Sequence, residues 1–123
     1  MTRRILLSVA LISSLTGALP AGAAEAPFES RLVRLAEILG SLHYLRNLCG
    51  EATNQWRQEM EDLLQAENPD AATRARYVSS FNNGYRSFAS GYTTCTDSAY
   101  AAIARYMSEG EELSRDIAVR FGN

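Results

Sequence analysis

Apolar residues recur at spacings of three and four along most of this chain, and no stretch alternates regularly between apolar and polar positions. The first pattern is that of amphipathic helices, whereas alternation would indicate strands. Polar breaks divide the pattern and predict four helices, over about 27–48, 53–66, 69–92 and 96–121. Because short connections join antiparallel neighbours, we expect an all-α fold, a small four-helix up-down bundle.

The first and third predicted helices each carry one continuous apolar stripe. The stripe of the first is Phe28, Leu32, Leu35, Leu39 and Leu42, and that of the third is Val78, Phe81, Tyr85, Phe88 and Tyr92. Cys49 and Cys95 continue these two series in phase. Pro27 suits the first position of a helix, and Gly50 is typical of the position just past the end of one.

The second and fourth predicted helices carry shorter or interrupted stripes. The stripe of the second is Trp56, Met60, Leu63 and Leu64, and that of the fourth is Tyr100, Ile103, Met107, Ile117 and Phe121. Gly110 interrupts the stripe of the fourth helix. We expect Trp56 to be largely buried against the first and third helices.

Residues that commonly cap helices mark the remaining boundaries. Asn68 can cap the third helix, Pro69 can open it, and Asp70 can favour the positive end of its dipole. Thr96 and Asp97 are both suitable caps for the fourth helix. These residues place the last two helix starts near 69 and 96.

The N-terminal segment differs from the rest of the chain. Two arginines precede an apolar run over 5–19, and small residues follow at 21–24, which is the order of a cleaved signal peptide. The run has about 15 residues, whereas a membrane span needs about 20. We therefore predict a cleaved signal peptide over 1–24 and a single helical domain over 25–123. The protein is then periplasmic or secreted, with no stable membrane span after cleavage.

The chain contains two cysteines, Cys49 and Cys95, which are 46 positions apart. A zinc site usually has four ligands and a redox pair is usually Cys-X-X-Cys, so neither pattern fits. Two cysteines in an exported protein most often pair. In an up-down bundle the first and third helices end at the same end of the molecule, which favours a disulfide staple between these two residues. Free or intermolecular thiols are the alternative.

Composition limits the possible partners. The 123 residues are 46% hydrophobic, which suits one small domain. The formal net charge is -2, so the chain as a whole has no electrostatic attraction to nucleic acid. No phosphate-binding loop, nucleophile elbow or H-E-x-x-H motif occurs. We therefore expect no cofactor, no metal site and no catalytic residues.

Several short motifs connect the chain to a known group of proteins. These are L-C-G and W-R-x-x-M in the first half, then F-N-x-G-Y-R, and C-T ahead of the last helix. With them, the sequence resembles a family of small exported alphaproteobacterial proteins of uncharacterised function with two cysteines. The resemblance implies export and a disulfide, and it implies no established activity.

The tract FNNGYRSFASGY, within the third predicted helix, is the strongest candidate for a binding site. Ring faces and hydrogen-bonding groups along it suit a sugar or a peptide, and the candidate residues are Asn82, Tyr85, Arg86 and Tyr92. The alternative is close helix packing, in which Gly84, Ser87 and Gly91 form an edge that a neighbouring backbone can approach. Glycine inside a helix costs about 1 kcal/mol relative to alanine, so either interpretation must explain its presence.

We expect a non-enzymatic cell-envelope module for binding or assembly, which recognises an unknown envelope protein or a wall component. The alternative is a small periplasmic hydrolase or wall-modifying enzyme that uses carboxylates such as Glu51 or Glu109 beside His43, the single histidine. Acidic residues at these helical spacings more often form a solvated face. His43 lies near the end of the first helix, where a cation is favourable, and we expect it to be partly exposed and structural.

Overall fold

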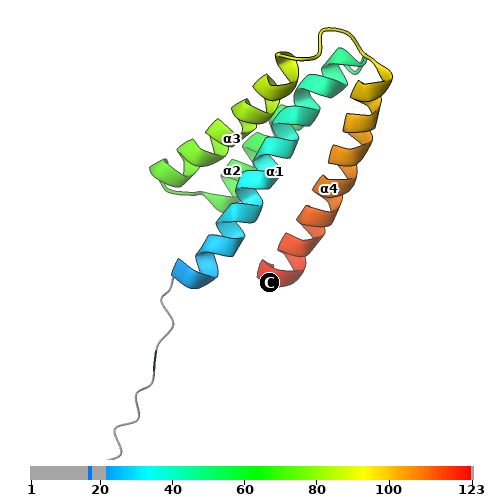
Figure 1. Ribbon diagram of the computed structural model, residues 1–123. Coiled ribbons are helices and arrows are strands. Elements are labelled where there is room, and N and C mark those ends of the chain that lie inside the picture. Colours follow the sequence, from blue (N-terminus) through cyan, green and yellow to red (C-terminus); the bar gives the residue numbers. More distant parts are fainter. Residues whose placement is uncertain (1–16, 18–21, 123) are drawn as a thin grey trace, which may run out of the picture.

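The computed structural model describes Gly17 and residues 22–122. These residues form four helices and no strand: α1 (Gly22–Leu48), α2 (Gln55–Glu67), α3 (Ala71–Ala89) and α4 (Asp97–Phe121). Helices α1 and α3 run in one direction and α2 and α4 in the other (Figure 1). The predicted all-α up-down bundle is confirmed. Most of the predicted signal peptide, 1–24, lies outside the described residues.

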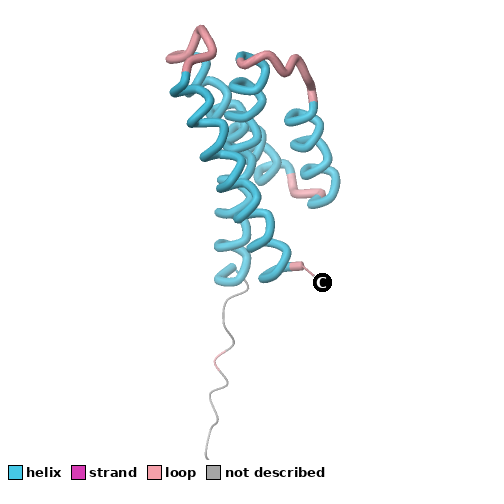
Figure 2. The backbone as a smooth tube through the Cα atoms, turned by 90° about the vertical axis from the view of Figure 1, so that its right-hand side faces the viewer, coloured by secondary structure: helices cyan, strands magenta, loops and turns pink. Residues whose placement is uncertain are grey.

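Helix α1 is the centre of the bundle, because it packs against each of the other three helices. Figure 2 shows α1 and α4 as the long helices, with shorter α2 and α3 beside them. Side chains on several sides of α1 are fully or almost fully buried, namely Leu32, Ala36, Ile38, Ser41, Leu42 and Leu45. The buried surface of α1 is therefore wider than the single stripe that the sequence predicted, because three helices cover it.

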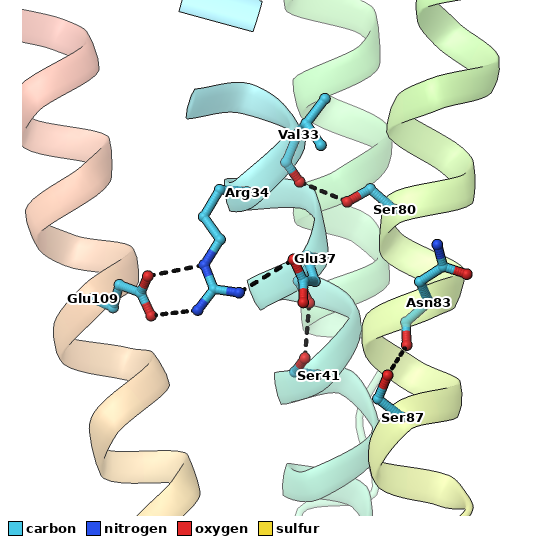
Figure 3. A network of polar contacts seen from close by, with 8 residues as sticks. All are labelled: Val33, Arg34, Glu37, Ser41, Ser80, Asn83, Ser87 and Glu109. Atoms are coloured by element: carbon cyan, nitrogen blue, oxygen red, sulfur yellow. Dashed lines mark hydrogen bonds and ion pairs between the residues drawn. The ribbon is translucent and has the colours of Figure 1, made fainter. Parts of the chain in front are cut away.

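Helices α1 and α3 approach each other backbone to backbone. A Cβ atom at Gly40 would overlap the carbonyl of Phe81, and one at Gly84 would overlap the carbonyl of Glu37. The hydroxyl of Ser80 donates a hydrogen bond of 2.7 Å to the carbonyl of Val33 (Figure 3). Small residues on both helices permit this approach.

The predicted packing edge on α3 is confirmed at Gly84 only. A Cβ atom at Gly91 would meet nothing within 4 Å. The Ser87 hydroxyl donates a hydrogen bond of 2.7 Å to the carbonyl of Asn83 in its own helix, and not to α1. Gly91 lies beyond α3, which ends at Ala89, three residues before the predicted end at Tyr92, and Ser87 is on an exposed position of the helix. The packing edge thus runs through Ser80 and Gly84.

Two other predicted helix boundaries are corrected. Helix α1 begins at Gly22, so Pro27 lies inside it rather than at its first position. Asn68 closes α2 in the left-handed conformation, with φ 42°, and does not cap α3. Asp70 caps α3 by accepting a hydrogen bond of 2.8 Å from the Thr73 N–H. Asparagine tolerates left-handed φ better than most residues, which explains its role at the end of α2.

The cap of α4 and the end of α1 agree with the sequence. Thr96 caps α4, because its hydroxyl accepts a hydrogen bond of 3.1 Å from the Ala99 N–H. Gly50 follows α1 with φ +100°, a conformation that favours glycine. Helix α4 continues through Gly110, which interrupts the apolar stripe but not the helix.

Cys49 and Cys95 form a disulfide, with a Cα–Cα distance of 5.0 Å. Cys49 directly follows α1, and Cys95 lies in the loop that connects α3 to α4. The predicted pair is confirmed, although Cys95 is on a loop and not on an extension of α3. The bond ties the turn between α3 and α4 to the end of the central helix.

Candidate functional site

Helix α2 packs on α1 and leaves a groove along each of its two sides. The α2–α4 groove has a volume of about 630 Å³, and its floor comes from Leu35, Ile38, Leu39 and Leu42 of α1. The α2–α3 groove is smaller, about 220 Å³. These grooves are the two candidate sites, because a concave surface with an apolar floor is where small ligands usually bind.

The α2–α4 groove is bounded by apolar side chains and has a polar rim. Trp56 of α2 and Met107 of α4 form its walls, and Gly110 adds no side chain where α4 passes Ile38. The rim consists of Glu59, Glu111, Ser114 and Arg115, all exposed. An amphipathic molecule matches this division between floor and rim.

Trp56 is 9% exposed, so its predicted burial is confirmed, but it lies in the groove beside α1 and α4 and does not line the groove beside α3, the helix predicted to cover it together with α1. Its indole Nε1 is buried and has no hydrogen-bond partner among the described residues. Buried tryptophan N–H groups usually have a partner. The guanidinium of Arg46 lies 5.9 Å from the centre of the indole ring. The wall of the α2–α4 groove therefore contains one donor that the described part of the chain leaves unsatisfied.

The α2–α3 groove has an apolar base and a basic rim. Met60 and Leu64 of α2 meet Phe81 of α3 at its base. Arg57 and Arg74 stand on opposite sides of it, one from each helix. Asn82, one of the predicted ligand-binding residues, also lines this groove.

The other predicted ligand-binding residues have different surroundings. The Tyr85 ring is 38% exposed and lies 5.8 Å from the ring of His43 and 5.2 Å from that of Tyr44. The Tyr92 ring instead lies 5.7 Å from that of Phe88. The two tyrosine rings thus have different neighbours and do not form one stacking surface.

Hydrogen bonds also place Tyr92 near the disulfide end of the bundle. Its hydroxyl lies 2.9 Å from the Ser98 hydroxyl, and its carbonyl accepts a hydrogen bond from the Tyr44 hydroxyl. Arg86 is exposed and forms no ion pair with the described acids. A binding role for Asn82, Tyr85, Arg86 and Tyr92 as a group remains a prediction.

His43 is half-buried between the rings of Phe81 and Tyr85, at centre-to-centre distances of 6.0 and 5.8 Å. Burial, and then the positive charge of Arg57, lower the pKa of His43 below its ordinary value. The predicted partial exposure of His43 is confirmed, and its lowered pKa favours the neutral imidazole rather than a cation.

The carboxylates considered for catalysis are paired with arginines. Arg34 donates two hydrogen bonds of 2.8 Å to Glu109, and it also lies 3.1 Å from Glu37 (Figure 3). The hydrogen bond from Arg34 lowers the pKa of Glu109, and the same bond raises the pKa of Arg34. Glu51 lies 2.6 Å from Arg46. Each acid thus has a cationic partner of its own.

These acids do not form a common centre with His43. Glu109 contacts α1 at Arg34, nine residues before His43, which is a helical rise of about 13 Å. Within the described residues, no three His, Cys, Asp or Glu side chains are grouped so that they could hold a metal ion.

Sequence reasoning missed most of the residues that form the grooves. No sequence pattern singled out Ser114 and Arg115 of α4, Arg57 of α2 or Arg74 of α3 as site residues. One signal was available: Gly110 removes a side chain from the stripe of α4. Because the facing residue could not be identified from spacing alone, that break did not indicate a groove.

The fold and its grooves define a small disulfide-linked helical bundle built around one central helix. A family profile described as "Protein of unknown function (DUF2385)" matches residues 27–121, and the chain belongs to this family. No curated protein and no solved structure matches the chain. The predicted membership of an uncharacterised family is confirmed, whereas alphaproteobacterial origin and export stay predictions. None of the described helices combines the length and apolar character needed to cross a membrane.

Proposed function

We propose that this protein is an exported, non-enzymatic binding module of the cell envelope, and that the α2–α4 groove holds its ligand. The disulfide and the signal-like N-terminal segment support export to an oxidising compartment. The ligand is an amphipathic envelope component with an apolar body and polar ends.

The observation that carries the proposal is the gap between α2 and α4 above the central helix. α4 has no side chain at Gly110, and apolar side chains of α1 line the groove between Trp56 and Met107, with Ile38 and Leu42 themselves buried beneath it. Its volume of about 630 Å³ is within the range of about 300–1,000 Å³ that is usual for small-molecule sites. A rim with two acids, Glu59 and Glu111, and one base, Arg115, provides partners for polar groups at the ends of the ligand.

The enzymatic alternative has weaker support. A general acid at neutral pH needs a carboxyl group with a raised pKa. Arg34 lowers the pKa of Glu109 instead. Glu51 is paired with Arg46, and the near neighbours of the His43 ring include the rings of Phe81 and Tyr85. These contacts favour binding over hydrolysis.

Dye displacement tests the proposal. The protein, expressed from its full sequence and purified in oxidised form, is titrated with anilinonaphthalene sulfonate while energy transfer from Trp56, the single tryptophan, is recorded. Soluble wall fragments and envelope lipids are then added as competitors. We expect the dye to bind in the groove and one of these competitor classes to displace it.

Two phenylalanine variants locate the dye. Ser114→Phe fills the rim of the α2–α4 groove and should weaken dye binding about tenfold, whereas Ser108→Phe adds the same ring to an exposed position of α4 outside the groove. Equal binding by both variants, or no displacement by any competitor, would overturn the proposal. Mass spectrometry of the recovered competitors tests the alternative: cleaved wall fragments that persist in Ser114→Phe and disappear in Glu109→Gln would indicate an enzyme.

A further inference from the structure

We propose that the α2–α3 groove is a second, independent site, which binds a small anion, a carboxylate or phosphate group with a short apolar substituent, between Arg57 and Arg74. This inference does not depend on the ligand of the α2–α4 groove. It rests on the position of the two arginines, on the apolar base between them and on the charge that they leave uncompensated.

Five of the ten arginines in the described region form no ion pair with a described acid, and two of these five line this groove. Arginines at five other described positions form ion pairs with carboxylates, namely Arg31, Arg34, Arg46, Arg76 and Arg120. Arg57 and Arg74 form none with the described acids, although both line the same small groove. Two guanidinium groups from different helices can each donate to one anionic group, and hydrogen bonds to charged groups are the strong ones.

Glu61 is the one acid that lines this groove, and it lies four residues after Arg57 on α2. The groove therefore has two positive charges and one negative charge at its rim. Glu61 forms no ion pair with either arginine within the described region. The net charge of the lining is positive, which favours an anion over a cation.

The apolar part of the ligand has a defined place. Met60 and Leu64 are buried at the base, and Val78 is 39% exposed beside them. The amide of Asn82 lies on the same lining and can donate to an anionic oxygen. A ligand whose anionic group meets the arginines can therefore cover Val78 with a short apolar chain.

His43 provides an internal reporter of occupancy. It is the single histidine of the chain, and burial and then the charge of Arg57 lower its pKa. An anion bound at Arg57 compensates that charge, so the pKa of His43 should rise when the site fills. By linkage, a probe whose own charge stays constant in this range, such as hexanoate, should bind more tightly below the pKa of His43 than above it. Arg57 of α2 is the charged group that acts on His43, while Glu61 and Arg74 line the groove beside Arg57.

The experiment follows the His43 imidazole resonance by NMR during a pH titration at constant ionic strength, adjusted with sodium chloride. Three probes are used: inorganic phosphate, hexyl phosphate and hexanoate. We expect a saturable rise in the pKa of His43 with all three, and tighter binding of hexyl phosphate than of inorganic phosphate because of the apolar base. The comparison of hexyl phosphate with hexanoate distinguishes the phosphate source from the carboxylate source.

Three arginine variants separate a site from general electrostatics. Arg57→Gln and Arg74→Gln should each weaken the binding of hexyl phosphate about tenfold, because each variant loses one charged hydrogen-bonding partner of the anion. Arg105→Gln removes an exposed arginine outside both grooves and should bind as the parent does. A pKa of His43 that stays constant with every probe, or equal losses in all three variants, would contradict the proposal. Ser114→Phe should leave this binding unchanged, so that failure of one site is distinguishable from failure of the other.

Discussion

Gly40 of α1 lies directly against the carbonyl of Phe81 in α3, so closely that a single methyl group at Gly40 would overlap it. Gly84 of α3 makes the reciprocal approach to the carbonyl of Glu37. Because the atoms in the way are backbone atoms, no side chain can rotate to make room. This contact holds α3 against the centre of the bundle.

We therefore expect Gly40→Ala and Gly84→Ala to lower the free energy of unfolding by at least about 2 kcal/mol each, since overpacking of this kind forces the backbone apart. Gly91→Ala is the matched control, because nothing lies within 4 Å of its added methyl. Urea unfolding at neutral pH checks all three. Full stability in Gly40→Ala would show that the two helices can separate at no cost.

The disulfide gives a second prediction. Closing the loop between Cys49 and Cys95 should contribute about 4 kcal/mol on the chain-entropy model, so Cys49→Ser should lower the free energy of unfolding by an amount of this order. Reduction of the parent should have a similar effect, and reduction should leave the variant unchanged. Rapid alkylation of two thiols in the native, unreduced protein would contradict the structural role.

His43 gives a prediction about pH. Its pKa is lowered in the folded state, so the unfolded chain binds the proton more readily as pH falls below the ordinary value of about 6.5. The free energy of unfolding should therefore decrease from pH 7.5 to pH 5.5 and level off below the folded pKa. His43→Gln should remove this slope.

The carboxylates act in a different pH window and provide the control. Hydrogen bonds lower the pKa values of Asp70, Glu109 and Asp116 in the folded state. These carboxylates therefore contribute to the free energy of unfolding at neutral pH, and that contribution is lost only as pH falls through the lowered values, below about 4. Urea unfolding should show a loss of stability below about pH 4 in both the parent and His43→Gln. The loss between pH 7.5 and pH 5.5 should occur in the parent alone. An identical slope above pH 5 in both would show that His43 is not its source.

Export is tested at the N-terminus. Mass spectrometry of the protein from the envelope fraction should show a chain that begins near Ala24 or Glu25. Because the helix α1 begins at Gly22, cleavage there would trim its first turn and leave the buried positions from Leu32 onward intact. An intact Met1 in that fraction would contradict the predicted signal peptide.

The sequence was informative wherever one local pattern determined the outcome. Helical spacing located four helices, and Thr96 and Gly50 marked two of their ends. Helix ends that depend on competing neighbours were less predictable. Asn68 suits either an N-cap or a left-handed C-cap, and the structure uses the second.

The candidate site was harder to predict, because it depends on distances between helices. Spacing indicated that Trp56 faces inward, but not that α4 passes it at a distance that leaves a groove. Gly40 was an ordinary position within a leucine-rich helix until its contact with Phe81 was known. Likewise, Arg57 and Arg74 share a groove only because α2 and α3 lie on adjacent sides of α1.

Binding in the α2–α4 groove is the central claim, and the indole resonance of Trp56 tests it most directly. The chain has one tryptophan, so a ¹⁵N-labelled sample gives a single indole N–H signal, from a group that has no partner among the described residues. When the envelope component that displaces the dye is titrated in, this signal and the amide of Gly110 should shift saturably, while the amides around Gly84 should stay in place. Saturable shifts confined to α3, or no shift at Trp56 and Gly110 at saturating ligand, would contradict the account.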